Sequence, residues 1–304
     1  MLTRRRLLTI SAALALTPAA LRAGTPPPAA RLWSGQALGA RASIRLAHPD
    51  AEAISGRVLA EIDRLEDILS LYRPDSALAR LNRDGQLDAP PFELLECLSL
   101  AGAVHGASGG RFDPTVQPLW ALWAEAAAAG HQPAPTEIAA RRAVVGWEGV
   151  TLDSSRISLR PGAALTLNGI GQGYVADRVA ALLTAEGLSE ILIDTGEFRA
   201  LGGQPGGGPW QITLAAGGQL GLSGRALASS SPLGTTFDQT GHDGHILEPA
   251  TGRPSAAAWR EIAISAPSAA LADALSTAAC MIPDREEIAA MVAQFPGARV
   301  EAAV

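Results

Sequence analysis

The stretch LTLNGIGQGYVADRV, residues 165–179, has a composition that suits phosphate binding. It reads as a short strand, a tight turn with Gly169, Gly171 and Gly173, and then a helix. A glycine turn that opens a helix presents bare backbone N–H groups beside the positive end of the helix, which attracts phosphate. Neither nucleotide fingerprint fits, because the stretch is not G-x-G-x-x-G and lacks the lysine of a G-K-[ST] loop. The turn predicts an anion site of another kind.

A second segment, ADALSTAA, could supply oxygen ligands for a metal ion. Asp273 and Thr277 are four residues apart on a predicted helix, so their side-chain oxygens lie on one face about one turn apart. A hard cation such as Mg²⁺, which keeps several waters and bridges phosphates, is commonly held by only one or two carboxylates. The alternative is an ordinary hydrogen bond on the helix surface.

His245, at the start of HILEPATG, could take a proton from an attacking hydroxyl or orient a phosphate. His242 lies three residues earlier and creates an H-x-x-H spacing. The intervening Asp-Gly indicates a turn rather than a helix, and no third ligand is evident, which argues against a zinc site.

Asp113-Pro114-Thr115 is typical of a helix start, with Asp113 as N-cap and Pro114 at the first helical position. Asn82 and Asn168 are the only asparagines in the chain. All of these polar residues stand in a chain that is otherwise rich in alanine and leucine.

The hydrophobic pattern predicts the elements that must position these residues. Val58, Ile62, Leu65 and Leu69 form one apolar helix face. We expect helices over about 51–72, 92–107, 116–129 and from the glycine turn to 186, and from about 268 and 283. We expect strands over 41–46, around 150 and 157, and over 190–195, 210–215 and 259–265, with another near 226. Strands and helices mix without strict βαβ alternation, which predicts an α+β fold with mixed sheets and packed helices.

Composition excludes several classes of function. The chain has 304 residues, 47% of them hydrophobic, and its 24 basic residues include no lysine. Schiff-base chemistry and a lysine general base are therefore excluded. A net charge of −6 with no basic stripe argues against nucleic-acid binding. Cys97 and Cys280 lie in apolar helix-like runs, which favours separate buried thiols over a disulfide.

The first residues predict an export signal. Residues 1–23 combine Thr-Arg-Arg-Arg-Leu-Leu, a short apolar stretch and a small-residue exit, as a Tat-type signal peptide does. The alternative is a basic, disordered N-terminus. Residues 24–30, GTPPPAA, predict a flexible leader, and residues 31–304 one domain or two interlocked subdomains. Removing residues 1–23 leaves 20 basic and 30 acidic residues, a net charge of −10.

Six segments together resemble the ApbE family, the FAD:protein FMN transferases, in the order of that family from about residue 32 to residue 282. They are LYRPDSALARLN (71–82), GGRFDPTVQPLW (109–120), LNGIGQGYVADR (167–178), LIDTGEF (192–198), HILEPATGRP (245–254) and ADALSTAA (272–279). The NGIGQGY form and the export signal are most similar to the periplasmic NosX-type branch, which is associated with maturation of a membrane flavoprotein.

The resemblance implies an ApbE-like fold and a Mg²⁺-dependent reaction. FAD is cleaved at its pyrophosphate, FMN passes to a threonine or serine hydroxyl of an acceptor protein with an FMN-binding domain, and AMP leaves. A NosR-type membrane flavoprotein is the acceptor implied by the narrower match. Asp273, Thr277 and the backbone carbonyl of Gly171 would hold the metal, and His245, Asp273 and Gln172 would act in catalysis.

The same resemblance implies a flavin-nucleotide site. The residues assigned to it are Tyr72, Asn82, Asp113, Thr115, Asn168, Gly169, Gly171, Glu197, Ser229 and Ser230. For Ser229 and Ser230 the alternative is a plain serine-rich loop. Tyr72, Trp120 or Tyr174 could stack on the isoalloxazine ring, with core packing as the alternative use.

The chain departs from the family where Gln172 stands in place of the usual lysine, and Leu38-Gly39-Ala40 in place of Met-Gly-Thr. Gln172 donates a hydrogen bond but carries no charge, so neutralising the transition state depends more on Mg²⁺ or on an arginine elsewhere. Two further functions stay open at this point. One is a Mg²⁺-dependent FAD pyrophosphatase, and the other is a catalytically weak flavin-binding or delivery protein.

Overall fold

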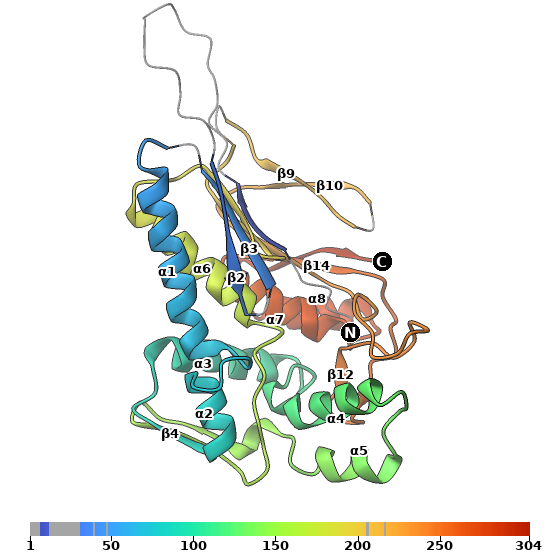
Figure 1. Ribbon diagram of the computed structural model, residues 1–304. Helices are drawn as coiled ribbons and strands as arrows, with labels where there is room; N and C mark the ends of the chain where they lie inside the picture. Colours follow the sequence, from blue (N-terminus) through green and yellow to red (C-terminus); the bar gives the residue numbers. More distant parts are fainter. Residues whose placement is uncertain (1–6, 12–30, 39, 47, 205–206, 216) are drawn as a thin grey trace, which may run out of the picture.

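The computed structural model describes residues 7–11, 31–38, 40–46, 48–204, 207–215 and 217–304. An eight-stranded sheet in the order β15–β14–β11–β8–β7–β1–β3–β2 lies at its centre (Figure 1). All neighbouring strands are antiparallel except the pair β1 and β3. The strands of this sheet are β1 (Leu7–Ser11), β2 (Arg31–Ala37), β3 (Ala40–Leu46), β7 (Ile191–Asp194), β8 (Phe198–Leu201), β11 (Ala226–Ser230), β14 (Ile262–Ala266) and β15 (Arg299–Ala303). The mixed sheet with packed helices confirms the predicted α+β class.

Eight α-helices and three small sheets complete the described part of the chain. The helices are α1 (Ala51–Leu69), α2 (Ala77–Asp84), α3 (Phe92–Ala107), α4 (Gln117–Ala128), α5 (Pro135–Arg142), α6 (Gly171–Ala185), α7 (Ala269–Ala279) and α8 (Arg285–Ala293), with short 3₁₀ turns η1 (Pro114–Val116) and η2 (Trp147–Gly149). The small sheets join β4 (Gln86–Asp88), β6 (Arg156–Leu159) and β5 (Val150–Leu152); β9 (Trp210–Thr213) and β10 (Gln219–Leu222); and β12 (Leu247–Glu248) and β13 (Arg253–Pro254).

The two faces of the central sheet are covered differently, and β11 shows how. Ala226 and Ala228 belong to the main core with residues of α6 and α7. Leu227, between them, belongs to a second core with Trp210 and Leu222 of the β9–β10 hairpin. Successive residues of a strand point to opposite faces. Helices therefore cover one face and the hairpin the other, which agrees with the arrangement in Figure 1.

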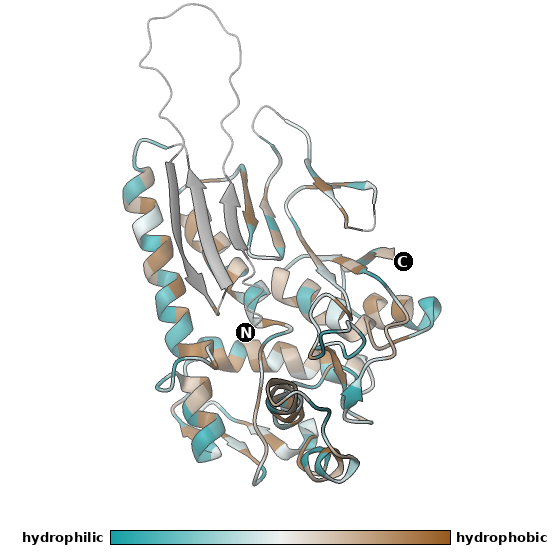
Figure 2. Ribbon diagram, turned by 45° about the vertical axis from the view of Figure 1, so that its right-hand side comes forward, coloured by the Kyte–Doolittle hydropathy of each residue, from teal (hydrophilic) through white to brown (hydrophobic). Residues whose placement is uncertain are grey.

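Helix α1 has the amphipathic pattern that the sequence predicts, and teal and brown residues alternate along it in Figure 2. Val58, Ile62, Leu65 and Leu69 are buried. The helix ends at Leu69, three residues before the predicted end, because Ser70 is extended and its side-chain oxygen accepts the Tyr72 amide. Arg73 then binds back to α1 through Glu66 and Asp67 at 2.9 and 2.5 Å.

Helices α6 and α7 pack at very close range. A Cβ added at Gly173 of α6 would lie 2.3 Å from the carbonyl oxygen of Ala269 in α7. Only a glycine allows this approach. Because α7 carries Asp273 and Thr277, this packing brings the metal-ligand candidates to the glycine turn.

We expect Gly173→Ala to lower the free energy of unfolding by about 1–3 kcal/mol, because the added methyl group must push the two helices apart. Urea denaturation of the purified protein measures this change. Gly56→Ala is the matched control: Gly56 is exposed inside α1, nothing lies within 4 Å of its added Cβ, and the change should stabilise by up to about 1 kcal/mol. Equal effects of the two substitutions would contradict the close packing.

Three sequence predictions concern the cysteines, the N-terminal segment and membrane-spanning helices. Cys97 and Cys280 are separate buried thiols, as predicted. The predicted signal segment 1–23 and leader 24–30 lie outside the described residues, apart from 7–11 in β1. Among the described residues, no helix is both long and apolar enough to cross a membrane.

Candidate active site

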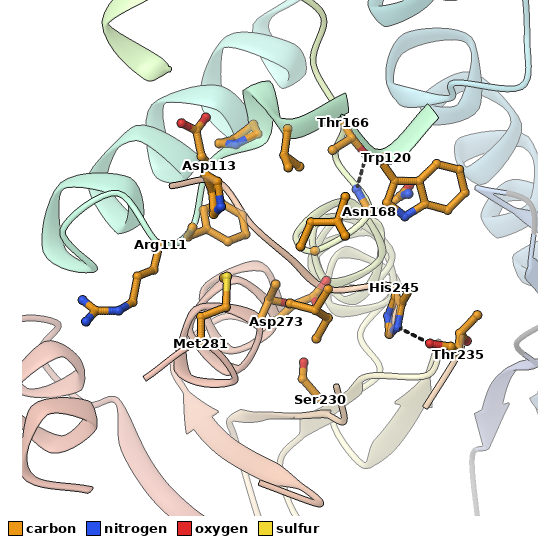
Figure 3. A pocket seen from close by; sticks show the side chains of 18 of the residues that line it. Arg111, Asp113, Trp120, Thr166, Asn168, Ser230, Thr235, His245, Asp273 and Met281 are labelled. Atoms are coloured by element: carbon orange, nitrogen blue, oxygen red, sulfur yellow. Dashed lines mark hydrogen bonds between the residues drawn. The ribbon is translucent and has the colours of Figure 1, made fainter. Parts of the chain in front are cut away.

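One pocket gathers half of the site residues predicted from the sequence (Figure 3). About 910 Å³ of space not filled by atoms lies within it, a volume that includes open solvent at its mouth. Five elements line it: the segment before α4, the glycine turn before α6, the end of β11, the loop from 231 to 249, and α7. The predicted site residues that line it are Asp113, Asn168, Gly169, Ser230, His245, Asp273 and Thr277.

The glycine turn and α7 meet inside this pocket. Gly173 N, in the first turn of α6, donates to Asp273 Oδ2 over 3.4 Å. A Cβ added at Gly169 would lie 3.0 Å from Thr277 Oγ1. The Asp273 carboxylate, only 3% exposed, thus lies beside the positive N-terminus of α6. Residues about a hundred positions apart in the chain come together as the sequence predicts.

Asn82 holds the segment that leads into the glycine turn, which is not a strand in the structure although the sequence predicted a short one there. Its Nδ2 donates to Leu165 O at 2.8 Å, and its Oδ1 accepts Leu165 N at 2.7 Å. Thr166 N donates to Pro114 O at 2.8 Å, and Thr166 Oγ1 accepts Asn168 N at 3.2 Å. Asn82 does not line the pocket. It acts through the backbone of Leu165 and fixes where the turn begins.

The ring of His245 has a defined tautomer. Nδ1 lies 3.0 Å from the carbonyl oxygen of Thr235, which is drawn as a dashed line in Figure 3. A carbonyl only accepts hydrogen bonds, so Nδ1 carries the proton and Nε2 of the neutral ring is the acceptor. The backbone N–H of His245 also donates to Thr235 O at 3.0 Å. Two hydrogen bonds therefore tie His245 to its loop and leave Nε2 as its basic atom.

Asp113 caps the 3₁₀ turn η1, as predicted, with Pro114 as the first residue of the turn. Its Oδ1 accepts the amide and the hydroxyl of Thr115 at 2.8 and 2.6 Å. Burial raises the pKa of Asp113, and the two hydrogen bonds from Thr115 oppose that shift. His105 Nδ1 donates to Phe112 O at 3.0 Å and lies 3.8 Å from Asp113 Oδ2. Thr115 is fully buried and holds Gly146 N instead of lining the pocket.

Strand alternation separates Ser230 from Ser229. Ser230 lies on the helix face of β11, lines the pocket, and its hydroxyl is 2.7 Å from that of Ser276 in α7. Ser229 is exposed and lies on the opposite side of the strand. The structure therefore places only Ser230 at the pocket, in contrast to the prediction that names both serines.

Other predicted site residues also lie outside the pocket lining. Tyr72 is 67% exposed, Glu197 is buried at 2%, and Gln172 is partly buried on α6. Gly171 is the buried first residue of α6, and an added Cβ there would lie 2.9 Å from Leu38 Cδ1. Tyr174, one of the aromatic candidates, is buried in the core and donates to Glu96 Oε2 at 2.5 Å, as expected of a core residue.

Sequence reasoning missed a cation at this pocket. Arg111 lines it, and its Nη1 is 2.9 Å from Glu287 Oε1 of α8. In Figure 3 its guanidinium points away from Asp273, His245 and Asn168. Arg111 lies within the GGRFDP stretch that the sequence analysis singled out, so a cation at the site could have been predicted. The sequence does not indicate that Glu287 of α8 would pair with it. Trp120, a second lining residue, packs edge-on against Phe237 at 5.7 Å between ring centroids.

The donor set of the pocket suits a hard cation. On α7 it offers the carboxylate of Asp273 and the hydroxyl of Thr277, and across the pocket a second carboxylate, Asp113, which accepts the amide and hydroxyl of Thr115. Such all-oxygen ligands are those that Mg²⁺ takes when phosphates and waters complete its coordination. Among the residues that the structure describes, no group of three or more His, Cys, Asp and Glu side chains could hold a metal.

The fold is α+β, and one pocket brings the glycine turn together with Asp273, Thr277 and His245. A model of the ApbE family matches residues 38–302. The chain belongs to the ApbE family.

Known proteins agree with this membership in sequence and in structure. An FAD:protein FMN transferase of Vibrio cholerae is 31% identical over 286 residues, covering 87% of this chain and 85% of that protein. The one of Haemophilus influenzae is 30% identical over 251 residues, covering 76% and 70%. The apo crystal structure of the flavinyl transferase ApbE of Pseudomonas stutzeri superposes with a TM-score of 0.76 at 27% identity, covering 89% of this chain and 90% of that one. The predicted ApbE-like fold is thereby confirmed.

Proposed function

We propose that this protein is a Mg²⁺-dependent FAD:protein FMN transferase that moves FMN to a threonine or serine hydroxyl and releases AMP. One observation carries the proposal: the glycine turn, the Asp273–Thr277 helix face and Nε2 of His245 converge on one pocket. The names of two relatives, each an FAD:protein FMN transferase, support the transfer of FMN from FAD.

In this proposal most of the pocket residues bind the substrate or the metal ion, and His245 transfers a proton. Asn168 and Gly169 of the glycine turn line the pocket and would lie beside the pyrophosphate of FAD, near the positive N-terminus of α6. Asp273 and Thr277 would hold Mg²⁺, which supplies positive charge for the phosphate oxygens when it is bound. Ser230 and Asn168, on opposite walls, offer hydrogen bonds to the nucleotide.

Nε2 of His245 accepts the proton of the acceptor hydroxyl as its oxygen attacks the phosphorus on the FMN side of the pyrophosphate. A new P–O bond forms to the acceptor, and the P–O bond to the AMP moiety breaks. The Thr235 carbonyl stabilises the resulting imidazolium through Nδ1–H. AMP leaves with the electron pair of the broken bond.

Incubating the protein with FAD, Mg²⁺ and an acceptor domain that carries the hydroxyl tests the proposal. We expect a fluorescent acceptor band that survives denaturation. One molecule of AMP should be released for each molecule of acceptor that becomes labelled. AMP without a labelled acceptor would instead select an FAD pyrophosphatase. Tight FAD binding with neither product would select a flavin-binding or delivery protein.

For the cellular setting, we propose Tat export to the periplasm and a membrane-anchored acceptor flavoprotein of the NosR type, as in the NosX-type branch. Arg4, Arg5 and Arg6 within residues 1–23 support this proposal. Replacing all three by lysine should retain the protein in the cytoplasm, as fractionation would measure. Unchanged periplasmic recovery would contradict Tat export.

We expect Arg111→Ala to raise the KM for FAD about tenfold, because a charged hydrogen-bond donor at the pocket edge is lost. Steady-state kinetics with varied FAD measures the change. Arg111→Lys should keep most of the affinity. Glu287→Gln removes the competing carboxylate 2.9 Å away and should lower the KM, whereas a KM that is the same in all three variants would show that Arg111 does not contact the nucleotide.

A further inference from the structure

A partly buried carboxylate on α6, that of Asp177, joins α6 to α7. Asp177 Oδ1 accepts the backbone amide of Ala269 at 2.9 Å, and Asp177 Oδ2 accepts that of Ala270 at 2.9 Å. These are the first two residues of α7. Their amides have no partner within the helix, so the carboxylate of one helix satisfies the free N-terminal donors of the other.

Charge fixes the orientation of this contact. The N-terminus of α7 is the positive end of its dipole, and Arg199 of β8 places Nε 3.1 Å from Asp177 Oδ1. The side chains of Asp177 and Arg199 are only 20% and 18% exposed. Burial raises the pKa of Asp177, and the two amides and Arg199 oppose that shift. The anion is thus surrounded by donors from α7 and from the sheet.

The same interface contains the closest packing between the two helices. Gly173, one turn before Asp177 on α6, contacts the Ala269 backbone, and Gly173 N also reaches Asp273 Oδ2. Asp273 and Thr277 lie one and two turns after Ala269 along α7. A shift of α7 along its axis would therefore move both oxygen ligands away from the glycine turn.

We propose that Asp177 is a positioning residue, which sets the register of α7 against α6 and so places Asp273 and Thr277 for the reaction. The inference rests on the proposed function, because Asp177 would act only by placing Asp273 and Thr277. Asp177 itself would not contact the substrate. Asp177 would thus keep the Asp273 carboxylate close to the glycine turn before any ligand binds. Misplacing a reacting group by about 1 Å can cost about 100-fold in rate.

The test compares Asp177→Ala, the isosteric Asp177→Asn and a matched control, Ser268→Ala. Ser268 is the N-cap of α7 and accepts Leu271 N at 3.2 Å, so its loss also weakens the start of α7 but leaves the link to α6 intact. We expect kcat to fall about 10- to 100-fold in Asp177→Ala. The fall should be smaller in Asp177→Asn, whose remaining oxygen still accepts one amide, and at most about twofold in Ser268→Ala.

Two readouts do not depend on turnover. Hydrogen exchange of the Ala269 and Ala270 amides should become at least about tenfold faster in Asp177→Ala, and the Mg²⁺ concentration that half-maximally raises FAD affinity should increase in parallel. If Asp177→Ala and Ser268→Ala match in exchange at these amides and in kcat, the proposed role of Asp177 is wrong. A wild-type protein that transfers no FMN, while the exchange difference persists, would refute the proposed function and leave the helix contact standing.

Discussion

Asp273→Ala is expected to reduce FMN transfer to the level measured without added Mg²⁺. Asp273 is the carboxylate that accepts the Gly173 amide in the first turn of α6, and the other candidate ligands, Thr277 and backbone carbonyls, are neutral oxygens. Removing it takes away the negative charge that would hold the cation next to the pyrophosphate. The measurement is fluorescent labelling of the acceptor across a range of Mg²⁺ concentrations.

Thermal unfolding separates the metal role from a structural one. Asp273→Asn keeps a side-chain oxygen that can accept the Gly173 amide, so the metal-free variant should melt within a few degrees of the wild type. Mg²⁺ with nucleotide should raise the melting temperature of the wild type, because a ligand that binds the folded protein stabilises it. The variant should show no such rise, because it would no longer bind Mg²⁺.

Thr277 provides the matched controls. Thr277→Ser keeps the hydroxyl and should keep most of the Mg²⁺ response, whereas Thr277→Val keeps the shape and should weaken it. Full Mg²⁺-dependent activity in Asp273→Ala would remove this residue from the metal site.

Much of this site could be predicted because short-range rules determine its parts. The Asp113-Pro114 helix start follows from capping, and the glycine turn with its helix follows from three glycines before an apolar pattern. The spacing of Asp273 and Thr277 follows from the helix period. The meeting of the two segments is inferred from the family resemblance, and the hydrogen bond from Gly173 to Asp273 agrees with it.

What the sequence did not predict depends on which elements face each other. The link of Asp177 and Arg199 to α7 arises only when α6, α7 and β8 pack together. The contact of Arg111 also depends on tertiary packing, because its partner Glu287 lies on α8, far along the chain. Ser229 shows how a register of one residue in β11 decides which of two adjacent serines faces the pocket.

His245→Ala should lower kcat for FMN transfer about 10²- to 10⁴-fold, the range in which a positioned general base contributes, and change FAD affinity little. The reason is the tautomer: Nδ1 donates to Thr235 O at 3.0 Å, so Nε2 is the atom that can accept the hydroxyl proton. Single-turnover labelling of the acceptor measures the chemical step, and quenching of flavin fluorescence measures binding.

Two amide variants distinguish proton transfer from ordering of the loop. His245→Asn would place an amide nitrogen near the position of Nδ1 and could keep the bond to Thr235 O, but it provides no base. His245→Gln places its amide nitrogen near Nε2 and loses that bond. The backbone hydrogen bond from residue 245 to Thr235 O persists in both. If Nε2 is the base, both variants are as slow as His245→Ala; if His245→Asn restores transfer, the histidine orders the loop and the proton leaves by another route.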